Sequence, residues 1–289
     1  MQFDVDWVDA FADAPFGGNG CAVVHDGAGL SDATCMAFVR ETSLVECTFT
    51  GPSDVADLRV RYFLASRELP FAGHPTVATV AALRHRNIIP DGPITIETGA
   101  GLVPVNISDG LVEMTQVAPR FGLRPPAGIV AAVGGISPND ILHPPQFVST
   151  GLPFCITVVR ERAVLERLRL DMAALEAYCT YLGTEGTDVM EPFWVTLDGA
   201  TALGNTFSRL LMAPPSPAED PFTGSATGAM AAYLWAEELI DRPRFVAEQG
   251  HGLSRPGQAQ VEVLGPRHAI TGVRVAGQAH VLMSGQLYL

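Results

Sequence analysis

Two segments of the chain begin with glycine and hydroxyl residues and continue as runs of small apolar residues. The first begins at Gly73-His74 and the second at Thr223-Gly224-Ser225. Because each run is apolar nearly all round, we expect two helices that are buried on every side. The first amides of such a helix lack partners and lie at the positive end of its dipole, so both starts could bind a carboxylate. The alternative is that the glycines only permit close packing and the hydroxyls only cap the helices.

Three further side chains could transfer or hold protons near these starts. Glu46 lies among apolar residues where a helix is expected to give way to a strand, and a desolvated carboxyl has a pKa raised toward the range useful for acid–base catalysis. His74 stands at the first helix start, and Asp220 shortly precedes the second. Each also has an ordinary interpretation, as a solvated glutamate, a capping or core histidine and a turn-forming aspartate. The other six histidines show no metal-ligand spacing, so no metal site is expected.

The elements that must position these residues form two similar series. Alternating polar and apolar residues predict strands at 3–7, 21–25, 47–50, 58–63, 94–98, 102–107, 111–116, 155–159, 193–197, 259–264, 272–275 and 278–289. Further helices are expected at 32–41, after the capping Ser31, and at 164–178. In each half the strands surround one apolar helix, which indicates an internal duplication. A stretch rich in Pro, Gly and Ala at 118–135 predicts the boundary between lobes 1–117 and 118–289, with the last strand able to return to the first lobe.

Composition excludes several classes of protein. The chain has 289 residues, 47% of them hydrophobic, so it can build a sizeable core. Its formal charge of −13 makes nucleic acid an unfavourable partner. All 18 basic residues are arginine, which excludes a lysine Schiff base and a pyridoxal phosphate anchor. We expect a cytoplasmic protein with no membrane span and no cofactor, whose thiols are reduced because the cysteines are odd in number and scattered, namely Cys21, Cys35, Cys47, Cys155 and Cys179.

Motifs spread over nearly the whole chain resemble the phenazine-biosynthesis PhzF-like family. The resemblance begins with Val-Asp-Ala-Phe at residues 8–11 and Pro-Phe-Gly-Gly-Asn at 15–19. It continues with Glu-Leu-Pro-Phe-Ala-Gly-His-Pro-Thr at 68–76 and Ser-Thr-Gly-Leu-Pro at 149–153. Glu-Asp-Pro-Phe-Thr-Gly-Ser-Ala at 219–226 and Glu-Gln-Gly at 248–250 complete it in the same order. The blocks at the two helix starts are the specific ones.

This resemblance implies a fold and a chemistry. It implies an α+β, diaminopimelate epimerase-like fold of two pseudo-symmetric lobes, each an open β-barrel or roll around a central helix. It implies a cofactor-free isomerase that moves a proton between carbons of a small cyclic or unsaturated carboxylic acid in secondary-metabolite biosynthesis. The family's catalytic residues fall on Glu46, His74, Asp220 and Ser225. Substrate-binding positions are expected at Asn19, Gly73, Thr223 and Gly224, and a homodimer is compatible with this interpretation.

Some positions depart from the family pattern and leave alternatives open. The thiol pair of the epimerase relatives falls on Ala72 and Thr223, so a two-thiol racemase is not expected. Val45, Cys47 and Thr227 replace the usual neighbours of the catalytic positions, and Gly20 replaces a proline. One alternative is therefore a carbon–carbon bond hydrolase in a pyrroline-type pathway that uses the same site. The other is a protein that binds small carboxylates without turning them over.

Overall fold

The N-terminal half is a closed barrel of strands. The computed structural model describes residues 1–184 and 191–289. Hydrogen-bonded pairs join its strands into a ring in which each strand contacts the next and the last returns to the first. In ring order the strands are β1 (Gln2–Ala10), β2 (Asn19–Val24), β3 (Glu46–Gly51), β4 (Leu58–Phe63), β6 (Gly92–Thr98), β7 (Gly101–Ser108), β8 (Leu111–Gln116) and β17 (Gly272–Tyr288).

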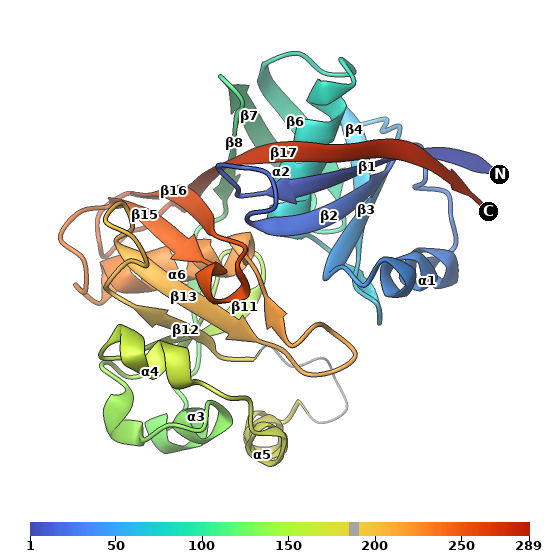
Figure 1. The fold of residues 1–289 in the computed structure, drawn as a ribbon. Coiled ribbons are helices and arrows are strands. Elements are labelled where there is room, and N and C mark those ends of the chain that lie inside the picture. The colour runs from blue at the N-terminus through green and yellow to red at the C-terminus, as the bar shows by residue number, and fades with distance from the viewer. Residues whose placement is uncertain (185–190) are drawn as a thin grey trace.

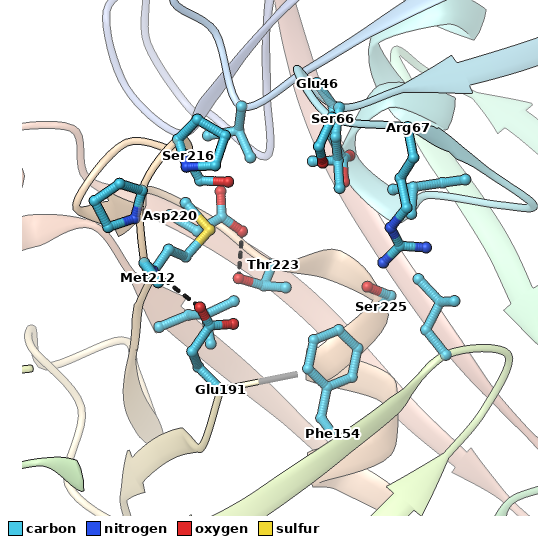
Figure 2. A pocket seen from close by; sticks show the side chains of 18 of the residues that line it. Glu46, Ser66, Arg67, Phe154, Glu191, Met212, Ser216, Asp220, Thr223 and Ser225 are labelled. Atoms are coloured by element: carbon cyan, nitrogen blue, oxygen red, sulfur yellow. Dashed lines mark hydrogen bonds between the residues drawn. The ribbon is translucent and has the colours of Figure 1, made fainter. Parts of the chain in front are cut away.

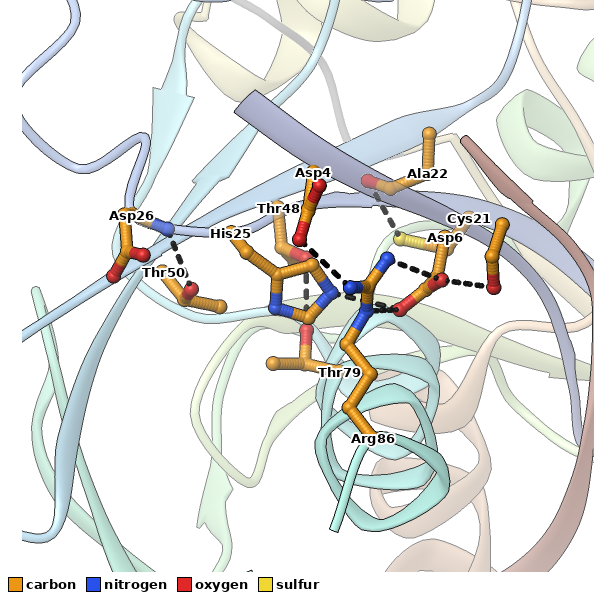
Figure 3. Close-up of polar contacts among 11 residues, drawn as sticks. Asp4, Asp6, Cys21, Ala22, His25, Asp26, Thr48, Thr50, Thr79 and Arg86 are labelled. Carbon is orange, nitrogen blue, oxygen red and sulfur yellow. Dashed lines mark hydrogen bonds and ion pairs between the residues drawn. The ribbon is translucent and has the colours of Figure 1, made fainter. Parts of the chain in front are cut away.

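Helix α2 (Gly73–His85) fills this barrel and packs against β1, β2, β3, β8 and β17. Ten of its thirteen residues are buried, as expected for a helix that is small and apolar all round. Its C-terminal end is fixed by Arg86, which donates to Asp4 and to the fully buried Asp6 (Figure 3). Burial alone would raise the pKa of Asp6, but hydrogen bonds from Arg86, Ser284 and His25 lower it below its ordinary value.

The C-terminal half repeats this plan as an open roll around α6 (Gly224–Ala236). Its strands are β9 (Arg120–Phe121), β10 (Gln146–Ser149), β11 (Pro153–Val158), β12 (Phe193–Thr196), β13 (Thr206–Leu211), β15 (Arg244–Gln249), β16 (Gly257–Leu264) and the first part of β17. Within residues 1–184 and 191–289 no pairing joins β9 back to β17. Figure 1 shows the two halves one above the other, with β17 running from beside β16 across the upper, N-terminal half. The α+β class with two similar lobes is confirmed, except that the first barrel is closed rather than open.

Strand register shows how closely the halves correspond. Thr48 opposes Tyr62 in the pair of β3 with β4, and Phe193 opposes Leu210 in the pair of β12 with β13. Short strands β5 (Glu68–Leu69) and β14 (Glu219–Asp220) then lead into α2 and α6. The ion pairs correspond as well, since Arg61 binds Glu68 in the first half and Arg209 binds Glu219 in the second. The internal duplication predicted from the sequence is therefore present, and these strands and ion pairs occupy corresponding positions in the two halves.

Two predicted elements were wrong in detail. The helix expected at 164–178 is two helices, α4 (Arg162–Arg167) and α5 (Met172–Leu182). The chain is extended at the buried Leu168, and Asp171 caps α5 by accepting from the amide of Ala174. The two strands expected after residue 272 are one strand, β17. Gly277 makes no turn there; a Cβ at this position would lie 2.3 Å from the ring of Phe11.

The remaining helices cover the outside of the two halves. They are α1 (Asp32–Thr42), α3 (Ala127–Val133) and the short turns η1 (Pro138–Asp140) and η2 (His251–Leu253). The expected helix after Ser31 is confirmed as α1. The region 118–135 holds β9 and α3, and the lobe boundary at 117/118 stays a prediction. No helix in the described ranges is long and apolar enough to cross a membrane.

Candidate active site

The two buried helices begin against each other. A Cβ added to Gly73 would lie 2.7 Å from the amide nitrogen of Ser225, and one added to Gly224 would lie 3.4 Å from the amide nitrogen of His74. Contacts below 3.0 Å leave no room for a side chain at residue 73. Close packing of the helices, the ordinary interpretation of these glycines, is thus confirmed. It also brings the polar residues of both starts to one place.

Glu46 is the first residue of β3, so it lies at the end of the barrel where that strand begins. The preceding helix α1 ends at Ser43, which adopts a left-handed conformation and turns the chain toward the strand. The Glu46 side chain is 14% exposed, and its Oε2 lies 3.6 Å from Nδ1 of His74. Burial raises the pKa of Glu46 to about 8, the negative charge of Asp220 adds to this, and Arg67 opposes it. A carboxyl with this pKa can both take and give a proton near neutral pH.

His74 and Asp220 lie behind Glu46 and are joined by Asn19. The Asn19 amide nitrogen donates to Asp220 Oδ1 at 2.6 Å and to the Phe222 carbonyl at 2.9 Å, and it lies 3.1 Å from His74 Nδ1. All three residues are at most 3% exposed. Burial lowers the pKa of His74 to about 3, so its ring is neutral at physiological pH. Asn19 therefore connects the first barrel to the segment that precedes α6.

Several hydrogen bonds hold Asp220 in place, and some of them involve Gln249, for which the sequence predicted no role. Burial raises the pKa of Asp220 to about 7, against hydrogen bonds from Thr223 and Asn19 that lower it. Gln249, which is fully buried, donates to the Asp220 carbonyl at 2.7 Å and accepts from the Thr223 amide at 3.1 Å. The Glu-Gln-Gly motif drew attention to Gln249, but only the three-dimensional contacts show that it fixes the turn carrying Asp220.

A pocket of about 240 Å³ opens between the halves at this point (Figure 2). Of the predicted site residues, Glu46, Asp220, Thr223 and Ser225 line it. Asn19, His74, Gly73 and Gly224 are not among its lining residues and lie beneath it. Two charged lining residues, Arg67 and Glu191, were not predicted. Apolar side chains complete the walls, namely Val45, Leu64, Leu69, Leu152, Phe154, Leu175, Leu210 and Met212.

Thiols and metal ligands do not gather in the described part of this site. None of its described lining residues is a cysteine, and Cys47, next to Glu46, is buried with a pKa raised by that burial to about 12. Within residues 1–184 and 191–289 no group of three or more His, Cys, Asp or Glu side chains could hold a metal ion. Among the described lining residues the charged groups are carboxyls and the Arg67 guanidinium, a set suited to proton transfer and to binding a carboxylate.

The same arrangement of chain and motifs is found in known proteins. The family model described as phenazine biosynthesis-like protein (PhzC-PhzF) matches residues 8–285. The chain belongs to this family. Trans-2,3-dihydro-3-hydroxyanthranilate isomerase of Pseudomonas aeruginosa is 30% identical over 98% of each chain.

Solved structures agree with this membership. A PhzF-family phenazine biosynthesis protein from Bacillus anthracis superposes with a TM-score of 0.86 at 26% identity over 100% of each chain. A predicted epimerase, PA4716 of Pseudomonas aeruginosa, gives a TM-score of 0.82 at 32% identity over 99% of each chain. The PhzF resemblance and the fold expected from it are confirmed, and the chain is an isomerase homologue.

Proposed function

We propose that the protein is a cofactor-independent isomerase that moves a proton between two carbons of a small cyclic or unsaturated carboxylic acid. The observation that carries this proposal is Glu46, a carboxyl 14% exposed in a pocket between the halves with a pKa of about 8. Such a group changes protonation state close to working pH, which is the condition for efficient general acid–base catalysis. The relative that isomerises a dihydroanthranilate supports the same class of substrate.

The reaction begins at the ionised form of Glu46. Its carboxylate takes a proton from a carbon made acidic by conjugation, and the electron pair left on that carbon spreads toward the substrate carboxylate. A proton is then added to another carbon of the same conjugated system, so no atom is gained or lost. General acid–base steps of this kind contribute about 10²–10⁴-fold, and positioning supplies more.

The other polar residues hold the substrate and the developing charge. Arg67 is the cation among the described lining residues and is suited to bind the substrate carboxylate. The Ser225 hydroxyl and the first amides of α6 are suited to stabilise the enolate oxygen. His74 stays neutral and, with Asn19, orients Glu46 and Asp220. The buried volume of about 240 Å³ limits the substrate to a small molecule.

The experiment is incubation of the purified protein with trans-2,3-dihydro-3-hydroxyanthranilate in deuterated water, followed by NMR and mass spectrometry. We expect deuterium at carbon and a product of unchanged composition without added metal or cofactor. Glu46→Gln keeps the shape of the side chain but cannot exchange a proton, so it should lose at least about 100-fold in turnover. Retention of more than about a tenth of the wild-type rate would contradict the role of Glu46, and a second small acid among the products would indicate the hydrolytic alternative.

A further inference from the structure

Glu191 stands in the C-terminal half where Glu46 stands in the N-terminal half. In β3, Glu46 precedes by two residues Thr48, which opposes Tyr62 of β4. Glu191 stands two residues before Phe193, the first residue of β12, which opposes Leu210 of β13. The ion pairs Arg61–Glu68 and Arg209–Glu219 fix the same correspondence one strand further on. The two glutamates are therefore equivalent positions of the internal duplication.

This equivalence determines where the two side chains point. Residues two apart in a strand share a face of the sheet. Thr48 bonds Thr79 of α2, and Phe193 packs in the core that includes α6, so this face is the inner one in both halves. Glu46 continues that face to the first residue of β3, and Glu191 lies in the segment that leads into β12. Both line the same pocket, and Figure 2 shows them on opposite sides of it, with Thr223 between them.

The local contacts hold the Glu191 carboxyl in place. Its Oε1 accepts a hydrogen bond from the Ala213 amide at 2.9 Å. The pocket holds about 240 Å³, so a ligand that fills it can touch both carboxyls. A planar conjugated acid bound between them would present one face to Glu46 and the other to Glu191.

We propose that Glu191 is a second catalytic residue, which delivers a proton to the substrate face opposite the one from which Glu46 removes it. This inference rests on the proposed function. Ionised Glu46 takes the proton from the first carbon, and the electron pair enters the conjugated system. Protonated Glu191 then gives its proton to the second carbon. Glu46 is left neutral and Glu191 charged, and exchange of one proton with water restores both.

If the two carboxyls act in different steps, two events can be measured separately with trans-2,3-dihydro-3-hydroxyanthranilate in deuterated water. One is exchange of deuterium into recovered substrate, which needs only Glu46. The other is product formation, which needs both carboxyls. We expect Glu191→Gln to lose at least about 100-fold in product formation with an unchanged KM, while exchange into substrate continues. Glu46→Gln should lose both events. The matched control is Glu176→Gln, an exposed residue of α5, which should change neither.

Each other outcome has a definite meaning. A raised KM with unchanged kcat in Glu191→Gln would make Glu191 a binding residue only and overturn this inference. Loss of exchange and product in equal proportion would make its role structural and overturn it as well. If Glu191→Gln does not fold, Glu191→Asp keeps the carboxyl and should retain exchange with slowed product formation; equal slowing of both contradicts the proposal. Neither exchange nor product with the wild-type protein would contradict the proposed function itself.

Discussion

At the scale of single residues, the site is defined by two neighbouring carboxyls with raised pKa values. Burial is the largest cause for both Glu46 and Asp220, and the Asp220 charge adds to the effect at Glu46. An isolated carboxyl without this environment would be fully ionised at neutral pH and a weak base. The desolvation argued from the apolar neighbours of Glu46 is thus found in the structure, whereas the electrostatic influence of Asp220 needed the fold.

The pH dependence of catalysis should report this coupling. If ionised Glu46 is the base, the rising limb of the kcat/KM profile has its midpoint near pH 8. Asp220→Asn removes the second cause of the raised pKa, so the midpoint should fall although the rate also falls. The measurement is the pH–rate profile, with a carboxyl ¹³C NMR titration of Glu46 beside it. An unmoved midpoint in Asp220→Asn, with Glu176→Gln as control, would contradict the coupling.

The raised pKa of Glu46 also predicts how the stability of the folded protein changes with pH. The folded pKa of Glu46, about 8, exceeds its unfolded value of 4.5, so the folded state binds the extra proton. Stability from this group is complete below pH 4.5 and is lost as pH rises through 8. The Glu46→Gln variant should therefore gain stability over the wild type across that window. Urea unfolding at pH 4.5 and pH 8.5 checks the direction, and equal differences at the two pH values would speak against it.

Ser225 should contribute binding rather than proton transfer. Ser225 is 8% exposed and lines the pocket at the start of α6. Ser225→Ala removes one donor and leaves the helix amides, so binding of a carboxylate should weaken by about 1–2 kcal/mol. Calorimetry with anthranilate, an aromatic acid that cannot react, measures this loss. Ser108→Ala, at an exposed position of β7, is the control, and equal affinities of Ser225→Ala and wild type would remove Ser225 from the carboxylate site.

At the scale of elements, the contact between α2 and α6 decides the geometry of the site. Gly73→Ala places a Cβ 2.7 Å from the Ser225 amide nitrogen. The atoms it meets belong to the backbone, so the two helices would have to move apart to accommodate it. Overpacking of this kind costs about 1–3 kcal/mol, and separation of the helix starts should also weaken ligand binding. Gly29→Ala, with nothing within 4 Å of the new Cβ, is the matched control. Urea unfolding midpoints of the two variants should differ clearly, and identical midpoints would refute the close packing.

Sequence patterns predicted these elements well where the pattern is local. Neighbouring residues alone predict the strands before residue 116, because polar and apolar residues alternate there. They also predict the two buried helices, because each is a run of small and mostly apolar residues. The sequence pattern did not predict the break between α4 and α5, because this break depends on the burial of Leu168 and on the capping of α5 by Asp171. Glu191 was missed because no local motif surrounds it. Only the register of β12 with β13 shows its equivalence to Glu46.

At the scale of the whole molecule, arginine ion pairs join segments distant in sequence. Since the chain has no lysine, these contacts are made by planar guanidinium groups that can bind several oxygens at once. Arg86 joins the end of α2 to β1. Arg255 spans the longest separation. It contacts Asp9 at 2.6 Å and donates to the carbonyls of Gly17 and Gly18 at 2.9 Å.

The ion pair of Arg255 with Asp9 should contribute both to the free energy of unfolding and to turnover. Asp9 is fully buried, and Arg255 is about one-third exposed. Arg255→Met leaves the Asp9 carboxylate without its cation, although the Phe16 amide still donates to it at 2.7 Å. Removing one partner of a buried ion pair costs about 3–5 kcal/mol, and the exposure of Arg255 places the expected loss at the lower end. Because Asn19 follows the loop that Arg255 holds, turnover should fall as well.

A double variant separates charge burial from loop anchoring. Asp9→Asn with Arg255→Met removes the uncompensated carboxylate, so urea unfolding should show a smaller loss of stability than Arg255→Met alone. The carbonyls of Gly17 and Gly18 still lack the guanidinium in that variant, so the loop stays loosened and Asn19 no longer holds Asp220 in register. Stability should therefore recover in part while turnover stays low. Full recovery of turnover would show that Arg255 acts on the fold alone, and a loss below about 1 kcal/mol in Arg255→Met would show that the buried pair stabilises neither.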